Sequence, residues 1–358
     1  MVVAARRAGR TGVRSALRTL ATAAVVGLAC APASAPPPEV AVAPPPPPAP
    51  VVVLAPAPPP PSVESNIVRA KGWSWLVERL AADGVDLGRA ERAFADPRIP
   101  SFDGLFFSID PAERRSLYGG VLRSRSIAQA RACAVEYAPA FAAAERATGV
   151  PAELVASILH IETRCGRNTG NSIVLYGLAR LAMANEPENL AANLERRAPK
   201  VGVAEPGVAD RVRARALVLD GLFYPEVRAV FTLAETWRVD PLALRGSPSG
   251  AFGYGQFLPT SYLRFGTDGN GDGKVDLYSI EDAAASTAAY LASYGWEGEL
   301  TRSARRQVIW HYNRSDAYID AVLALSDKLH GSVRPVYAET PAPVAPTTAG
   351  SVPAPAGQ

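Results

Sequence analysis

A glutamate near the end of a predicted helix, Glu162, is the strongest candidate for a catalytic residue in this sequence. An apolar stripe at helical spacing precedes it, formed by Val155, Ile158 and Leu159. Glu162 continues this stripe, so the apolar surroundings would disfavour the charged carboxylate and raise its pKa. A carboxyl group of this kind can act as a general acid near neutral pH. The structural alternative is an ordinary helix-end glutamate paired with Arg164 or Arg167.

A glycine-rich stretch, GSPSGAFGYGQFLPTSY from Gly246 to Tyr262, is the second candidate site. Its closely spaced glycines predict a loop in which the backbone approaches another group closely. The rings of Tyr254 and Phe257 could stack against sugar faces, and Ser247 or Gln256 could hydrogen-bond the polar substituents of the sugars. An irregular structural loop is the alternative.

A third stretch, DGNGDGKVDLYSIED from Asp268 to Asp282, has the spacing of a calcium-binding loop. Oxygen donors stand at positions 1, 3, 5 and 7, and a glycine stands at position 6. These donors are Asp268, Asn270, Asp272 and the carbonyl of Lys274. Position 12 holds Ser279 where a standard EF-hand has Glu, so the closing acid has to come from Glu281 or Asp282. A solvated turn is the alternative.

The stretch WHYNRS, from Trp310 to Ser315, ends a predicted helix. Tyr312 and Asn313 could orient a substrate or a carboxyl group. Asn313 could equally cap the helix, which is the simpler interpretation of this stretch alone.

The segments that must position these residues are mostly helical. Apolar residues recur at helical spacing, many alanines favour close helix packing, and no pair of alternating strands stands out. The fold class that we expect is mainly α. The predicted helices span 73–82, 87–95, 127–147, 152–163, 208–223, 225–237, 280–294, 303–312 and 317–328.

Composition excludes several classes of protein. The net charge of +3 and the absence of clustered Lys and Arg along a helix argue against nucleic acid as a partner. The 3 cysteines in 358 residues are too few for a disulfide scaffold.

The two ends of the chain differ from the middle. Residues 1–31 predict a signal peptide, because a basic segment precedes a ten-residue apolar stretch that is too short to span a bilayer. Cys30 lies in a sequence similar to a bacterial lipobox, but ordinary signal-peptidase sites are also present, so we leave lipidation open. Residues 32–62 predict a proline-rich linker, 63–331 the folded domain, and 332–358 a disordered tail rich in Pro, Ala and Thr.

Taken together, the four motif stretches resemble the catalytic domain of MltB-type lytic murein transglycosylases, glycoside hydrolase family 103. That family has an ETR-x-G helix end, a G-S-x-x-G-A-x-G-Y-G-Q-F loop, an EF-hand-like loop closed three residues late, and a Y-N motif. This sequence has ETRCG, GSPSGAFGYGQF, DGNGDGKVDLYSIED and HYN in the same order, within residues 139–325.

The resemblance implies a lysozyme-like α domain with additional helical regions and an EF-hand-like calcium loop. It implies cleavage of the MurNAc–GlcNAc β-1,4 bond of peptidoglycan glycan strands in the periplasm, with 1,6-anhydro-MurNAc ends and Glu162 as the single acid and base. Outer-membrane attachment would follow if Cys30 is lipidated. The resemblance also implies substrate contacts from Ser247, Tyr254, Gln256, Tyr312 and Asn313, and Ca²⁺ ligation by Asp268, Asn270, Asp272, Lys274 and Asp282.

This sequence departs from the family at Cys165, where an aromatic residue is common. Cys165 could pair with Cys133 in an oxidising compartment, or both could remain buried thiols. Two other functions stay open: a hydrolytic muramidase on the same scaffold, and a peptidoglycan-binding protein without activity.

Overall fold

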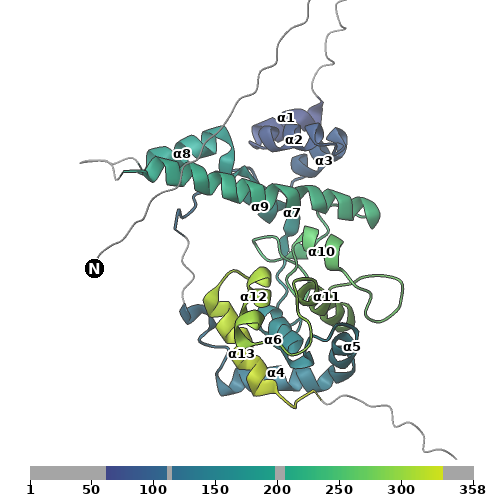
Figure 1. Cartoon of the computed structure of the whole chain (residues 1–358). Helices are drawn as coiled ribbons and strands as arrows, with labels where there is room; N and C mark the ends of the chain where they lie inside the picture. Colours follow the sequence, from purple (N-terminus) through teal and green to yellow (C-terminus); the bar gives the residue numbers. More distant parts are fainter. Residues whose placement is uncertain (1–61, 111–114, 198–205, 334–358) are drawn as a thin grey trace, which may run out of the picture. The chain divides into compact units, whose positions relative to one another are not determined.

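The computed structural model describes residues 62–110, 115–197 and 206–333 (Figure 1). The predicted signal peptide with Cys30, nearly all of the predicted linker and most of the predicted tail lie outside the described residues. The described part is mainly helical, which confirms the expected class. Its helices are α1 (Val63–Ala70), α2 (Ser74–Ala82), α3 (Leu87–Ala95), α4 (Ser124–Glu136), α5 (Ala138–Thr148), α6 (Ala152–Thr163), α7 (Val174–Ala182), α8 (Pro187–Arg197), α9 (Val208–Thr236), α10 (Pro259–Phe265), α11 (Ile280–Ser293), α12 (Arg302–Tyr312) and α13 (Asp316–Leu329), with short 3-10 turns η1 (Arg115–Tyr118) and η2 (Met183–Asn185).

Helix α6 is surrounded by α4, α5, α11 and α13, which all contact it (Figure 1). Nine of its twelve residues are buried. A helix that is apolar on most of its faces can be stable only when other helices surround it, because its burial supplies most of its stability. The sequence stretch that carries Glu162 is therefore held on several sides.

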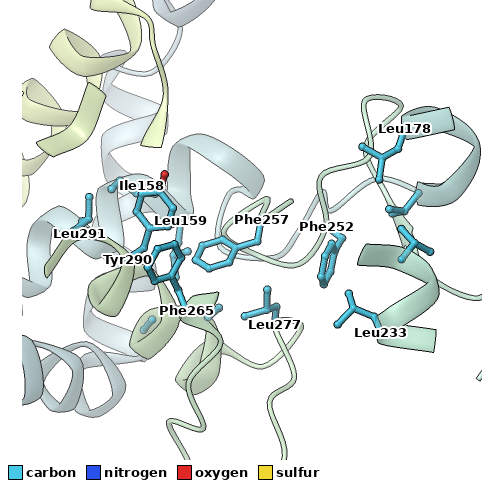
Figure 2. Packing of buried hydrophobic residues seen from close by; sticks show 14 of the residues in the cluster. Ile158, Leu159, Leu178, Leu233, Phe252, Phe257, Phe265, Leu277, Tyr290 and Leu291 are labelled. Atoms are coloured by element: carbon cyan, nitrogen blue, oxygen red, sulfur yellow. The ribbon is translucent and has the colours of Figure 1, made fainter. Parts of the chain in front are cut away.

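The core runs through the glycine-rich loop. Figure 2 shows Phe257 pointing toward Tyr290 and Phe265, while Phe252 lies nearer to Leu233. The centroids of the Phe257 and Tyr290 rings are 5.9 Å apart. Two buried aromatic side chains thus anchor the loop. The expectation that Phe257 stacks against a sugar was wrong, because its ring is 3% exposed and packs in the core.

Two predicted helix boundaries were wrong. The predicted helix 127–147 is interrupted at Tyr137, which ends α4 and precedes α5, and Pro139 falls in the first turn of α5, where its missing N–H costs little. Pro225, where we expected a break, lies inside α9. The proline removes one helical hydrogen bond, but Tyr224, Val227 and Val230 are buried on either side of it and hold both halves in one helix.

Helix α2 is tied to α9 by polar contacts around one tyrosine. The Tyr224 hydroxyl donates to Asp83 Oδ2 at 2.8 Å and contacts the Arg79 carbonyl at 3.0 Å. The Arg79 guanidinium lies 3.6 Å from the Tyr224 ring centroid and also pairs with Asp220. Burial is the main reason that the pKa of Tyr224 is raised above its ordinary value, so the hydroxyl remains a donor.

One strand pair was missed by the sequence pattern. Strands β1 (Ser172–Ile173) and β2 (Arg245–Gly246) pair antiparallel, with Ser172 opposite Gly246. Two residues are too few to show an alternation of polar and apolar positions. This pair joins the chain that follows α6 to the start of the glycine-rich loop.

We predict that Gly246→Ala destabilises the fold. A Cβ atom at this position would lie 2.1 Å from the Ala251 carbonyl oxygen, so the backbone would have to shift. Overpacking of this kind costs about 1–3 kcal/mol of the free energy of unfolding, which urea denaturation would measure. The control is Gly221→Ala in α9, where an added Cβ atom would meet nothing within 4 Å. Equal stability of the two variants would contradict the prediction.

Candidate active site

Glu162 lies one residue before the end of α6, where the chain turns sharply. Arg164, Cys165 and Gly166 all have positive φ angles, of 53°, 55° and 83°. The N–H groups of Arg164 and Cys165 donate to the carbonyls of His160 and Leu159, which closes the helix in the manner of a left-handed cap. Two non-glycine residues in this conformation are sterically costly, so surrounding contacts must hold the turn in place.

Two tyrosines lie beside the Glu162 carboxyl group. The Tyr318 hydroxyl donates to Glu162 Oε1 at 2.6 Å, across 156 residues of sequence. Tyr312 is the second, and its hydroxyl donates to the Gly255 carbonyl. Burial first, and then the nearby Glu162 carboxylate, raise the pKa of both tyrosines well above the ordinary value. Both therefore stay protonated at neutral pH and remain hydrogen-bond donors.

Tyr318 was not among the predicted site residues. It is 1% exposed and stands on the apolar stripe of α13, with neighbours such as Ile319 and Val322. A tyrosine in such a stripe has the pattern of a core residue, and no sequence signal distinguished it. Only the crossing of α13 over α6 places its hydroxyl on Glu162.

The glycine-rich loop packs directly on the end of α6. A Cβ atom on Gly166 would lie 2.2 Å from the Tyr254 ring, so the glycine is required for this contact. The Thr163 hydroxyl donates to the Tyr254 carbonyl at 2.8 Å and accepts the Gly166 N–H at 2.9 Å. Tyr254 is thus held beside the end of α6.

The other predicted substrate-binding residues have structural contacts of their own. Gln256 has a φ of 51°, and its amide donates to the carbonyls of Gly253 at 3.0 Å and Thr169 at 3.3 Å. The Ser247 hydroxyl accepts the Ala251 N–H at 3.1 Å, inside the turn that starts the loop. Asn313 is the residue that ends α12, in an extended conformation. The loop therefore has the structural role that we considered, and the half-buried Tyr254 also borders the end of α6.

A disulfide bond joins Cys133 of α4 to Cys165, with their Cα atoms 6.6 Å apart. It holds the turn after α6 against the neighbouring helix. A cross-link of this kind restricts the unfolded chain and stabilises the fold by about 2–4 kcal/mol. Through this bond, Cys165 supports the turn next to Glu162. The family that this sequence resembles commonly has an aromatic residue at this position.

The predicted calcium loop is closed by hydrogen bonds to its own backbone. Asp268 accepts the N–H groups of Gly271 and Gly273 at 2.6 and 2.8 Å. The fully buried Asp282 accepts those of Gly269 and Asp276 at 2.8 and 2.6 Å. The N–H of Gly273 is the main cause that lowers the pKa of Asp268.

The oxygen donors of this loop fit Ca²⁺ in type, and a carboxylate oxygen that accepts one N–H keeps a second lone pair. However, in residues 62–110, 115–197 and 206–333 no group of three or more His, Cys, Asp or Glu is placed to hold a metal ion. The structure thus provides the donors of a calcium loop but does not show an assembled calcium site.

Comparison with known proteins decides the family. Residues 74–305 match the transglycosylase SLT domain. The chain belongs to the transglycosylase SLT domain family. It is also 33% identical over 161 residues to membrane-bound lytic murein transglycosylase B of Escherichia coli K12. That match covers 45% of this chain and 36% of the relative, so the chain spans little more than a third of the curated relative that it matches.

Solved structures share the fold of this SLT domain. The E. coli lytic transglycosylase Slt35, in complex with bulgecin A, has a TM-score of 0.54 at 20% identity and covers 73% of this chain and 93% of its own. Another structure of Slt35 is in complex with calcium. SltB3 of Pseudomonas aeruginosa, in complex with NAG-anhNAM-pentapeptide, has a TM-score of 0.52 at 20% identity, with 75% and 80% covered.

The SLT domain also buries a neutral histidine two residues before Glu162. His160 Nε2 and Ser126 Oγ share a hydrogen bond of 2.9 Å. Burial, followed by the positive charges of Arg164 and Arg167, lowers the pKa of His160 from 6.5 to about 4. Between pH 4 and pH 6.5, His160 therefore binds a proton in the unfolded chain but not in the folded domain.

We predict that this difference in proton binding by His160 destabilises the folded domain in acid. The contribution of His160 to the free energy of unfolding is complete above pH 6.5 and is lost as the pH falls toward 4, because the unfolded state binds more protons in that window. Denaturation at a series of pH values would measure this slope. His160→Gln should flatten it, while the exposed His330→Gln should leave it unchanged. Equal slopes for wild type and His160→Gln would contradict the prediction.

Proposed function

We propose that this chain is a lytic transglycosylase that cleaves the MurNAc–GlcNAc β-1,4 bond of peptidoglycan and leaves 1,6-anhydro-MurNAc ends. The observation that carries the proposal is the half-buried Glu162 at the end of α6, hydrogen-bonded by Tyr318 beside the glycine-rich loop. Family membership and the E. coli relative support this activity.

Glu162 would act as both acid and base. It first donates a proton to the glycosidic oxygen while the bond from that oxygen to C1 of MurNAc breaks. The 6-hydroxyl of the same MurNAc then attacks C1, and Glu162 takes its proton. The new C1–O6 bond replaces the broken one, so neither water nor a second catalytic carboxylate is needed. The carboxylates of Asp268 and Asp282 accept backbone N–H groups in their own loop, so this mechanism does not need either of them as a second catalytic group.

The surrounding residues would bind and orient the reacting sugars. Tyr318 would hold the Glu162 carboxyl in position, and Tyr312, whose hydroxyl donates to the Gly255 carbonyl, would line the same space. Ser247, Tyr254, Gln256 and Asn313 would contact the glycan strand from the loop and from the end of α12. The contact between Tyr254 and Gly166 at the end of α6 supports the role of Tyr254. Ring faces and amide groups also suit sugar faces, hydroxyls and acetamido groups.

Glu162→Gln tests the catalytic assignment. The amide keeps the shape of the side chain but cannot donate and accept the proton, so we expect kcat to fall by about 10²–10⁴-fold. Mass spectrometry of digested sacculi would measure the anhydro-MurNAc ends that are released. The matched control is Glu153→Gln at the opposite end of α6, which should retain full activity.

Each alternative has its own outcome in this assay. Reducing ends without anhydro product would indicate a hydrolytic muramidase. An absence of products from the wild-type protein would favour a binding protein. Full activity of Glu162→Gln would show that the catalytic residue lies elsewhere.

We also propose that the loop from Asp268 to Asp282 binds one Ca²⁺ ion. The ligands would be the side chains of Asp268, Asn270, Asp272 and Asp282 with the carbonyl of Lys274, and the ion would stabilise the loop and not take part in the reaction. The calcium complex of Slt35 supports this proposal. The ion would also neutralise the carboxylates that the loop brings into proximity.

Ca²⁺ should therefore raise the thermal midpoint of the protein. An ion at 100 times its Kd adds about 2.7 kcal/mol to the free energy of unfolding, because it binds only the folded state. Scanning calorimetry with added Ca²⁺ or EGTA would measure the shift, and Asp272→Ala should abolish it. An unchanged midpoint in the wild-type protein would refute the calcium site.

For its location, we propose export to the periplasm, with Cys30 as a site of lipid attachment to the outer membrane. The E. coli relative is membrane-bound by name. Among the described residues, no helix is long and apolar enough to cross a membrane.

A further inference from the structure

The disulfide bond between Cys133 and Cys165 borders a cavity at the turn that follows α6. The volume of this cavity is about 210 Å³, and both cysteines line it. Tyr254 and Gly166, whose close contact joins the glycine-rich loop to the end of α6, line the same cavity. The bond is therefore next to the contact that holds the proposed sugar-binding loop against the helix of Glu162.

The cavity gives a small thiol access to the bond. Cys165 is half-buried and Cys133 is 6% exposed, so Cys165 is the more accessible of the two cysteines. The charged residues that line the cavity are two arginines, Arg164 and Arg167, and one glutamate, Glu136. The species that attacks a disulfide is the thiolate anion, and the excess of positive charge favours its approach.

The turn needs support from outside its own helix. Arg164 and Cys165 both have left-handed φ angles, which are sterically costly for residues other than glycine. The hydrogen bonds donated by the N–H groups of Arg164, Cys165 and Gly166 end on residues 159–163 of α6 itself. These hydrogen bonds do not join the turn to a neighbouring helix, whereas the disulfide bond joins it to α4.

Cleavage of the disulfide would let the turn relax. Cys165 would be free to leave the left-handed conformation, since nothing covalent would then hold its side chain against α4. Gly166, the next residue, lies so close to the Tyr254 ring that an added Cβ atom would be 2.2 Å from it. A shift of the turn would therefore displace Tyr254 or open its contact with the end of α6, only a few residues from Glu162.

We propose that the Cys133–Cys165 bond positions the turn for the reaction and that its reduction by a dithiol converts the enzyme into a slower form. The proposal rests on the proposed function and adds a positioning role and a redox control to the same site. Cys133 and Cys165 touch no reacting atom in this proposal. They act through the turn and through the contact of Gly166 with Tyr254.

Reduction of the bond takes two steps. The first thiolate of the dithiol attacks the sulfur of Cys165, forms a mixed disulfide with it and releases the Cys133 thiolate. The second thiolate then attacks the sulfur that the dithiol contributes to the mixed disulfide, and the Cys165 thiolate leaves. Two electrons and two protons pass from the dithiol to the two cysteines, and the dithiol itself becomes a disulfide.

The test compares the oxidised and the reduced protein at a temperature at which circular dichroism shows both to be folded. We expect dithiothreitol to lower kcat on sacculi about tenfold, with KM changed less than about threefold, because small displacements of a catalytic group reduce the rate strongly. Reoxidation should restore kcat. Cys133→Ala/Cys165→Ala should have the kcat of the reduced protein, and dithiothreitol should not change it.

Amide hydrogen exchange shows whether the turn itself responds. The N–H groups of Arg164, Cys165 and Gly166 are hydrogen-bonded in the structure and should exchange slowly in the oxidised protein. After reduction, exchange at residues 164–166 should become about tenfold faster or more, because the turn opens locally. A bond that only stabilises the whole fold would lower the thermal midpoint without this local change.

The matched control lowers stability elsewhere. Val77 of α2 is 2% exposed and lines no part of this cavity, so Val77→Ala destabilises the fold by leaving a void away from the turn. This variant should keep the wild-type kcat while it is folded, and dithiothreitol should lower its kcat as it does that of the wild type. The control separates the position of the turn from a general loss of stability.

Three outcomes would overturn the proposal. The oxidised and reduced proteins could have the same kcat, the double cysteine variant could still respond to dithiothreitol, or exchange at residues 164–166 could stay unchanged after reduction. If the wild-type protein cleaves no glycan in either state, the proposed function fails. Hydrogen exchange, which needs no substrate, would then still decide whether the bond holds the turn.

Discussion

The close contact between the glycine-rich loop and the chain after α6 is the constraint on which the site depends. Gly166 meets the Tyr254 ring, and a Cβ on Gly170 would lie 2.3 Å from the Gly246 carbonyl oxygen. Neither contact leaves room for a side chain. Because β1 pairs with β2 in the same region, two segments more than seventy residues apart are held in one register. The position of Glu162 relative to the loop follows from this contact.

The site combines a costly turn with several supports. Arg164 and Cys165 adopt the left-handed conformation directly after the helix. The disulfide to Cys133 and the Thr163 hydroxyl hold that turn, and α13 packs on the helix itself. The supports come from elements far apart in the sequence. A carboxyl group that must give and take a proton benefits from such rigidity, because small displacements from the reacting atoms reduce the rate strongly.

Much of the fold could be predicted from local patterns, and the errors have physical causes. The helix that carries Glu162 was predicted with its bounds, because a run of apolar residues between a proline and a glycine signals its ends. The break at Pro225 was wrong because burial of Tyr224 and Val227 outweighs the loss of one hydrogen bond. The strand pair β1–β2 was missed because its two residues show no period.

The sequence by itself determined the chemistry that is available: a carboxyl group on an apolar stripe, a loop of glycines and aromatics, oxygen donors at calcium-loop spacing, and cysteines able to pair. These are properties of residue types and of short spacings, which local physics governs. Only the tertiary structure decided that Tyr318 binds Glu162, that Gly166 faces Tyr254, and that a disulfide bond lines a cavity beside that contact. Such contacts arise where helices cross, and their geometry depends on the packing of the whole core, which no local pattern contains.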